Sequence, residues 1–161
     1  MSNIYDFKMK DIFGNLVDFK KYKNKVLIIV NVASKCGNTK QYADLQQFHS
    51  MFFDKGLCIL GFPCNQFFMQ EPKNENEIYQ FCTTKYNVEF EMFSKIKVNG
   101  PEACELYNYL KESFPWTSRA KNVKWNFEKF VVDKTGKTRY RIDNKDSILN
   151  YKNEIEKLLN E

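Results

Sequence analysis

The chain has 161 residues, of which 43% are hydrophobic and 16% aromatic, and its formal net charge at pH 7 is +5. This length and composition are typical of one globular domain, so we expect residues 1–161 to share a single core. They exclude a disordered chain, and no apolar run approaches the roughly 20 residues of a membrane-spanning helix.

The first half of the chain predicts a hairpin followed by a strand, a helix and a second strand. Residues 5–19 alternate around a Gly-Asn pair at 14–15, which is typical of a β-hairpin. The unbroken apolar run at 26–32 predicts a strand that is buried on both faces. Helical spacing of apolar residues follows from about 38 to 54, and residues 57–62 predict a second buried strand.

The second half predicts two helices, another hairpin and a last helix. Acidic residues in the first turn support a helix over 74–85, and the next helix carries Leu106 and Leu110. A hairpin is predicted over 127–142, and Asp146 or Ser147 would cap the last helix. Two buried strands joined by a helix require a right-handed parallel crossover. The order predicts an α/β thioredoxin-like fold: a mixed central sheet with helices on both faces and an N-terminal β-hairpin.

One cysteine stands at a strand-to-helix turn. Cys36 follows the strand at 26–32 and precedes the predicted helix, with Lys35 beside it. Unpaired N–H groups at a helix N-terminus, and a neighbouring cation, favour the thiolate form of cysteine. Because the thiolate attacks peroxides and disulfides, this position predicts redox chemistry.

The cysteine count points to a reducing compartment. Five cysteines without CxxC spacing fit neither a disulfide framework nor a zinc cage. Nothing else in the sequence suggests a metal site or a nucleotide-binding loop, so we expect no metal and no cofactor. Residues 1–6 lack the build of a signal peptide, which makes the cytoplasm the default expectation, with an organelle possible after removal of a presequence. The only dense basic cluster, 20–25, predicts a solvated turn and no role in binding nucleic acid.

Four segments carry the chemistry, each at the end of a predicted strand or in the loop beyond it. They read NVASKCG at 31–37, FPCNQF at 62–67, QEP at 70–72 and WNFEKF at 125–130. In this order they closely resemble the glutathione peroxidase family, and the resemblance spans nearly the whole chain. It implies a catalytic tetrad of Cys36, Gln70, Trp125 and Asn126. Side-chain amides and an indole N–H are neutral donors suited to holding a thiolate and stabilising charge on a leaving oxygen.

The resemblance also implies a role for Cys82 on the helix predicted at 74–85. Family members that use thioredoxin carry a resolving cysteine at this position. In the implied cycle, a hydroperoxide oxidises Cys36 to a sulfenic acid, Cys82 condenses with it to a disulfide, and thioredoxin reduces the disulfide. If the two thiols start far apart, the helix must unwind for this bond to form. The remaining cysteines are expected to be structural: Cys58, Cys64 and Cys104.

Other functions remain open at this point. Glutathione would serve as reductant of a one-cysteine peroxidase that needs no resolver. The same cysteines would also serve a peroxide sensor or redox relay that passes its disulfide to a partner protein. A thioredoxin-type disulfide oxidoreductase is disfavoured, because Thr39 stands where CxxC spacing would place the second cysteine.

The chain departs from the family at Phe67-Phe68-Met69, where small or polar residues are usual. This apolar bulk would either form a lipid-facing lip beside the site or pack against Trp116. The segment between Gly100 and Trp125 is short, which resembles the monomeric branch that accepts bulky hydroperoxides, including those of phospholipids. Three cations precede Trp125: Arg119, Lys121 and Lys124. They would attract an anionic phospholipid surface or an acidic thioredoxin, or they would belong to a solvated charged loop with no binding role.

Overall fold

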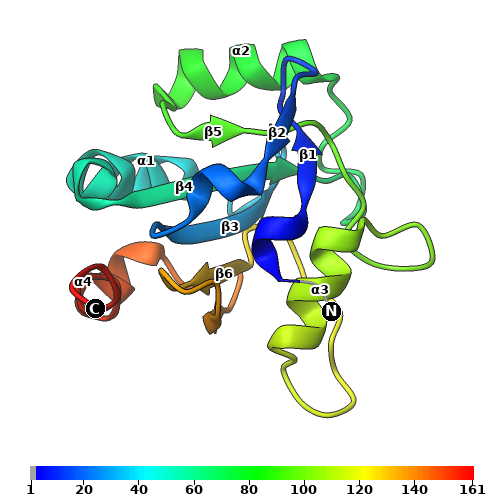
Figure 1. Ribbon diagram of the computed structural model, residues 1–161. Coiled ribbons are helices and arrows are strands. Elements are labelled where there is room, and N and C mark those ends of the chain that lie inside the picture. Colours follow the sequence, from blue (N-terminus) through cyan, green and yellow to red (C-terminus); the bar gives the residue numbers. More distant parts are fainter. Residues whose placement is uncertain (1–2) are drawn as a thin grey trace.

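The computed structural model describes residues 3–161 (Figure 1). Residues 1 and 2, which belong to the segment 1–6 that lacks the build of a signal peptide, lie outside the described residues. The N-terminal hairpin is confirmed. Strand β1, Lys8–Lys10, pairs antiparallel with β2, Leu16–Asp18. The outer ends of the predicted hairpin instead form short 3-10 helices, Ile4–Asp6 and Phe19–Tyr22.

A five-stranded mixed sheet forms the centre, in the order β5-β4-β3-β6-β7. Strand β3 pairs parallel with β4 and antiparallel with β6, which in turn pairs antiparallel with β7. The strands are β3, Val26–Val32; β4, Leu57–Pro63; β5, Glu91–Met92; β6, Lys129–Val132; and β7, Thr138–Ile142. Strand β5 was not predicted from the sequence, because two residues are too few to show an alternating pattern.

Four α-helices surround the sheet: α1, Gln41–Phe52; α2, Glu75–Tyr86; α3, Glu105–Ser113; and α4, Lys152–Leu159. Helix α1 begins three residues later than predicted, because the chain at 37–40 forms tight turns. The last predicted helix is split. Ser147 caps a 3-10 helix at Ile148–Tyr151, and α4 follows it directly. None of the helices within 3–161 is long and apolar enough to cross a membrane.

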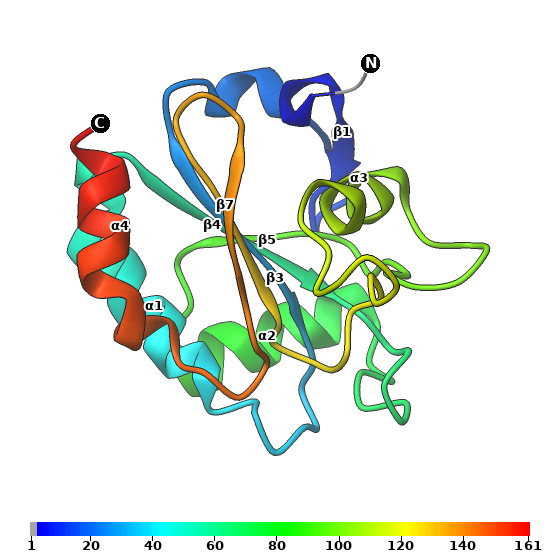
Figure 2. The same ribbon diagram turned by 90° about the horizontal axis from the view of Figure 1, so that it is seen from below.

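Strand β3 separates two apolar clusters. The even-numbered residues of β3 pack with residues of α1, α2 and α4: Val26, Ile28, Val30 and Val32. Leu27 and Ile29 point to the other face and pack with α3 and the N-terminal 3-10 helices. Figure 2 shows α1 and α4 on one side of the strands and α3 on the other. The strand is buried along its whole length, as its unbroken apolar sequence predicted. The expected mixed sheet with helices on both faces is therefore confirmed.

Candidate active site

The sheet topology brings three chain segments to one edge. Because β3 and β4 are parallel, the loops that leave their carboxyl ends start side by side. Strand β6 runs antiparallel to β3, so the segment that enters β6 reaches the same edge. These three segments carry Cys36, Gln70 and the pair Trp125-Asn126 respectively.

Cys36 lies half-exposed in the loop between β3 and α1. The backbone N–H of Asn38 donates to its sulfur at 3.3 Å. Its own N–H donates to Thr39 Oγ1 at 2.9 Å, and that hydroxyl donates to Ala33 O at 2.8 Å. A tight turn therefore follows Cys36, where the sequence predicted the first turn of the helix. Thr39, which stands where CxxC spacing would place a second cysteine, stabilises this turn through its side-chain hydroxyl.

Gln70 is tied to both of its neighbours in the site. Its backbone oxygen accepts from the N–H of Lys35, directly beside Cys36, at 2.9 Å. Its side-chain Oε1 accepts from Asn126 Nδ2 at 2.8 Å, and Asn126 is fully buried. Within residues 3–161, Gln70 Nε2 donates to no protein group, and the Gln70 side chain is partly exposed.

Trp125 shares an open hollow of about 420 Å³ with Cys36. Its indole N–H donates to no group in the described part of the chain. Its ring packs against Phe67, with centroids 5.5 Å apart, and edge-on against Phe68 at 5.0 Å. Its backbone oxygen accepts from the buried amide of Asn31 at 3.0 Å, so Asn31 ties this segment to the end of β3.

The apolar loop before Gln70 forms a lip beside Trp125, because both of its phenylalanine rings pack on that indole and neither pairs with the Trp116 ring. Phe68 is 82% exposed and Met69 71% exposed. Both residues have a φ of 53°, in the left-handed region, which costs an L-residue roughly 1–2 kcal/mol. Such strain at two exposed apolar residues is a feature of functional loops.

Two of the three cations that precede Trp125 in the sequence form ion pairs with carboxylates. Lys121 pairs with Glu112 at 2.9 Å. Lys124 lies 3.7 Å from an oxygen of Asp143 and 4.0 Å from the centroid of the Trp116 ring. Arg119 alone of the three has no ion pair among the described residues. This arrangement favours the solvated loop over an anion-binding patch.

Cys82 lies in a very different place, on the inward face of α2. It is fully buried in the cluster under α1 and α2, and all five cysteines are unpaired. Burial raises the pKa of its thiol to about 12. A capping box holds the first turn of α2: Asn74 Oδ1 accepts from Glu77 N, and the Glu77 carboxylate accepts from Asn74 N.

The three other cysteines do not join the site. Burial raises the thiol pKa of each of them above its ordinary value, so they stay protonated: Cys58, Cys64 and Cys104. They fit the structural role expected from the sequence.

The sequence reasoning missed Glu71. It directly follows Gln70, is fully buried, and accepts a hydrogen bond from Ser34 Oγ at 2.5 Å. Its N–H donates to Asn65 Oδ1 at 3.0 Å. The QEP motif placed Glu71 at the site, but nothing in the sequence indicated that its carboxyl is buried.

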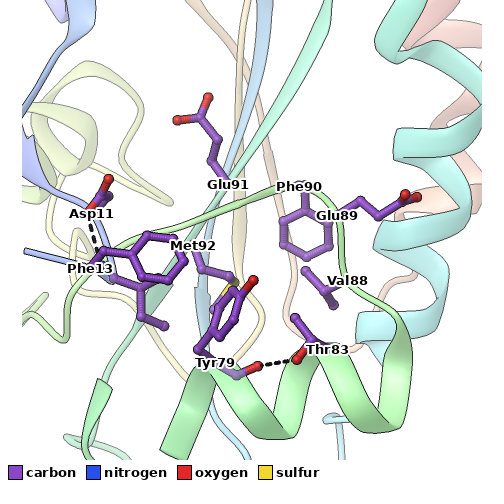
Figure 3. Close-up of a pocket in the computed structure, with 10 residues that line it drawn as sticks. Asp11, Phe13, Tyr79, Thr83, Val88, Glu89, Phe90, Glu91 and Met92 are labelled. Carbon is purple, nitrogen blue, oxygen red and sulfur yellow. Dashed lines mark hydrogen bonds between the residues drawn. The ribbon is translucent and has the colours of Figure 1, made fainter. Parts of the chain in front are cut away.

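A second hollow, of about 410 Å³, is lined by the tip of the hairpin, by α2 and by residues 88–92, and none of the tetrad residues lines it. Figure 3 shows Phe13, from the tip of the hairpin, beside Tyr79 of α2. Their ring centroids are 4.9 Å apart. This contact joins α2 to the hairpin beside the hollow.

Comparison with known proteins places the chain among peroxidases. The model for the glutathione peroxidase family matches residues 4–111. A "glutathione peroxidase-like peroxiredoxin" of Candida albicans is 46% identical over 164 residues, which cover 99% of this chain and 95% of the relative. A "hydroperoxy fatty acid reductase" of Synechocystis is 45% identical over 141 residues, which cover 84% of this chain and 83% of the relative.

Solved structures show the same fold. The crystal structure of T. cruzi GPX1 matches with a TM-score of 0.80 and 31% identity, over 99% of this chain and 97% of that one. A thiol:disulfide interchange protein of the thioredoxin family from Chlorobium tepidum matches with a TM-score of 0.72 at 14% identity, over 95% and 92% of the two chains. The expected thioredoxin-like fold is thereby confirmed.

Proposed function

Because the chain belongs to the glutathione peroxidase family and is a peroxidase that reduces hydroperoxides, we propose a two-cysteine cycle for it. In this cycle Cys36 is the peroxidatic cysteine and Cys82 the resolving cysteine. Gln70, Trp125 and Asn126 complete the catalytic group, and thioredoxin is the reductant.

In the first step the Cys36 thiolate attacks one oxygen of the hydroperoxide. The O–O bond breaks, and the other oxygen leaves as hydroxide or alkoxide and takes up a proton to give water or an alcohol. Cys36 becomes a sulfenic acid. Charge develops on the leaving oxygen, so N–H donors fixed in advance around it lower the barrier.

The observation that carries this assignment is the meeting of three segments at one site: Trp125 lines the same hollow as Cys36, and the backbone of Gln70 binds Lys35, next to Cys36. Asn126 occupies Gln70 Oε1, which leaves the Gln70 amide nitrogen free to donate into the site. Trp125, whose indole N–H donates to no group in the described part of the chain, borders the same hollow as Cys36. These neutral donors stabilise a thiolate and a leaving oxygen without forming an ion pair that would quench the sulfur.

In the second step Cys82 condenses with the sulfenic acid. The S–S bond forms, the S–O bond breaks and water leaves, after which thioredoxin reduces the disulfide. Cys82 is fully buried on α2, so we expect α2 to unwind locally before this bond forms. The peroxiredoxin name of the Candida albicans relative supports a protein reductant.

Organic and lipid hydroperoxides are the substrates that the exposed lip favours. Phe68 and Met69 place apolar surface next to Trp125, where the tail of such a substrate would lie. The Synechocystis relative, named for hydroperoxy fatty acids, supports the same class.

The burial of Cys82 favours one alternative, a one-cysteine peroxidase reduced by glutathione. NADPH-coupled turnover with thioredoxin or glutathione tests the two, using the wild type, Cys82→Ser and the matched control Cys58→Ser. We expect fast thioredoxin-dependent turnover that Cys82→Ser abolishes and Cys58→Ser retains.

Glutathione turnover that survives Cys82→Ser would contradict the two-cysteine cycle. Rapid oxidation of Cys36 without turnover by either reductant would indicate a peroxide sensor or relay instead.

A further inference from the structure

The loop that carries two residues of the proposed catalytic group has no regular secondary structure of its own. Residues 114–128 run from the end of α3 to the start of β6 (Figure 2) and form neither helix nor strand. Trp125 and Asn126 lie near the end of this loop. Because no helix or sheet hydrogen bonds hold its backbone, the loop needs partners from outside to keep these residues in place.

A buried ion pair supplies such partners. Arg141 on β7 and Glu128, the last residue of the loop, have fully buried side chains. Arg141 Nε donates to Glu128 Oε2 at 2.9 Å, and Arg141 Nη2 lies 2.8 Å from the same oxygen. The other carboxylate oxygen, Oε1, accepts from the backbone N–H of Lys124 at 3.1 Å. Glu128 thus connects the guanidinium to the residue directly before Trp125.

Arg141 also binds the loop backbone directly. Its Nη1 donates to the backbone oxygen of Phe114 at 3.0 Å. Its Nη2 donates to the backbone oxygens of Lys121 and Asn122 at 2.8 and 2.9 Å. The guanidinium lies 4.7 Å from the centroid of the Trp116 ring. One side chain therefore binds the loop at its first residue and again in its second half.

The contribution of this pair is geometric more than energetic. Taking two charges out of water costs about as much as their attraction returns, so replacing both partners by apolar residues of similar volume is often neutral for stability. Residues 114–122 are all at least partly exposed, so water can bind the backbone groups that such a replacement would free. Water does not fix their position, whereas a planar guanidinium with several donors does.

We propose that the buried pair of Arg141 and Glu128 positions Trp125 for the attack on the hydroperoxide. By fixing the backbone that leads to Trp125, the pair holds the indole at the hollow that Trp125 shares with Cys36. Neither member of the pair lines that hollow, so both act through Trp125 and are positioning residues. The proposal rests on the proposed function, because it deepens the role given there to Trp125.

The double variant Arg141→Met/Glu128→Leu tests this role without leaving one charge buried and uncompensated. Quenched-flow mass spectrometry follows the loss of the free Cys36 thiol on mixing with hydrogen peroxide. We expect oxidation to slow by on the order of 100-fold, which is the cost of misplacing a catalytic group by about 1 Å. In a Trp125→Phe background the same double variant should slow it by less than about twofold, because an effect exerted through the indole disappears with it.

Arg139→Met is the matched control, because it removes an arginine from the same strand. The ion-pair partners of Arg139 are Asp133 and Glu161, which lie outside the loop. Oxidation of Cys36 should keep the wild-type rate in this variant. A slowing equal to that of the double variant would show a general effect of losing an arginine from β7, and it would overturn the proposal.

Arg141→Lys tests the same contacts with a smaller change to the fold. Lysine keeps a positive charge next to Glu128 but lacks the planar fork that binds several acceptors at once. We expect oxidation to slow by about tenfold. In a Trp125→Phe background this slowing should again disappear.

The outcomes separate this role from the proposed function. A wild-type rate in the double variant or in Arg141→Lys, beside a slow Trp125→Phe, would overturn the positioning role alone. A slowing that multiplies with that of Trp125→Phe would also overturn it, because the pair would then act elsewhere in the fold. A Trp125→Phe variant that oxidises at the wild-type rate would remove Trp125 from the proposed function, and this role with it.

Discussion

The two cysteines of the proposed cycle occupy opposite environments. Cys36 lies half-exposed in a loop, its sulfur accepts from the backbone N–H of Asn38, and it shares a hollow with Trp125. Cys82 is fully buried in a helix, and burial raises its thiol pKa to about 12. In the proposed cycle, the thiol that meets the hydroperoxide is therefore the partly exposed one, and the resolving thiol is the buried one. Three variants test this contrast.

The largest effect is expected at Cys36. Cys36→Ser removes the attacking sulfur, and a serine hydroxyl is far too weakly acidic to replace a thiolate at neutral pH. Peroxide consumption should fall by at least about 1,000-fold, a barrier increase of about 4 kcal/mol. The peroxide assay checks this, with Cys104→Ser as the control that keeps activity. Comparable losses in both variants would move the peroxidatic role away from Cys36.

An intermediate effect is expected at Trp125. Trp125→Phe keeps an aromatic ring against Phe67 and Phe68 but removes the indole N–H. Loss of one preorganised donor should slow oxidation of Cys36 by on the order of 100-fold. Trp116→Phe removes the other indole of the chain, which lies under Lys124, and should slow this step far less. If the two variants oxidise at the same rate, the Trp125 N–H plays no part in the step.

The smallest effect is expected at the start of α2. Asn74→Ala removes the side chain that accepts from Glu77 N, and loss of an N-cap costs about 1 kcal/mol. Local opening of α2 should become about fivefold more frequent, and disulfide formation should speed up accordingly. Quenched-flow mass spectrometry measures the rate. Asn3→Ala breaks the other capping box, in the 3-10 helix at Ile4–Asp6, and should leave the rate unchanged. A slower rate in Asn74→Ala would contradict gating by α2.

Local patterns predicted the elements that carry most of the site. The apolar run at 26–32 became β3, and the acidic start of the helix at 74–85 became the capping box of α2. The start of α1 and the two-residue strand β5 escaped prediction, because tight turns and very short strands leave no periodic signal.

Within the site, the sequence by itself determined which residues are present: a cysteine after a buried strand, and the motifs that contain Gln70, Trp125 and Asn126. Only the tertiary structure decided that Asn126 binds Gln70 Oε1, that Phe68 packs on Trp125, and that Glu71 and Cys82 are buried. The physical reason is that hydrogen-bond partners and burial depend on contacts between segments far apart in the chain. Residue type and spacing record local preference, whereas the packing of α1, α2 and the loop beyond β4 fixes which groups lose their water.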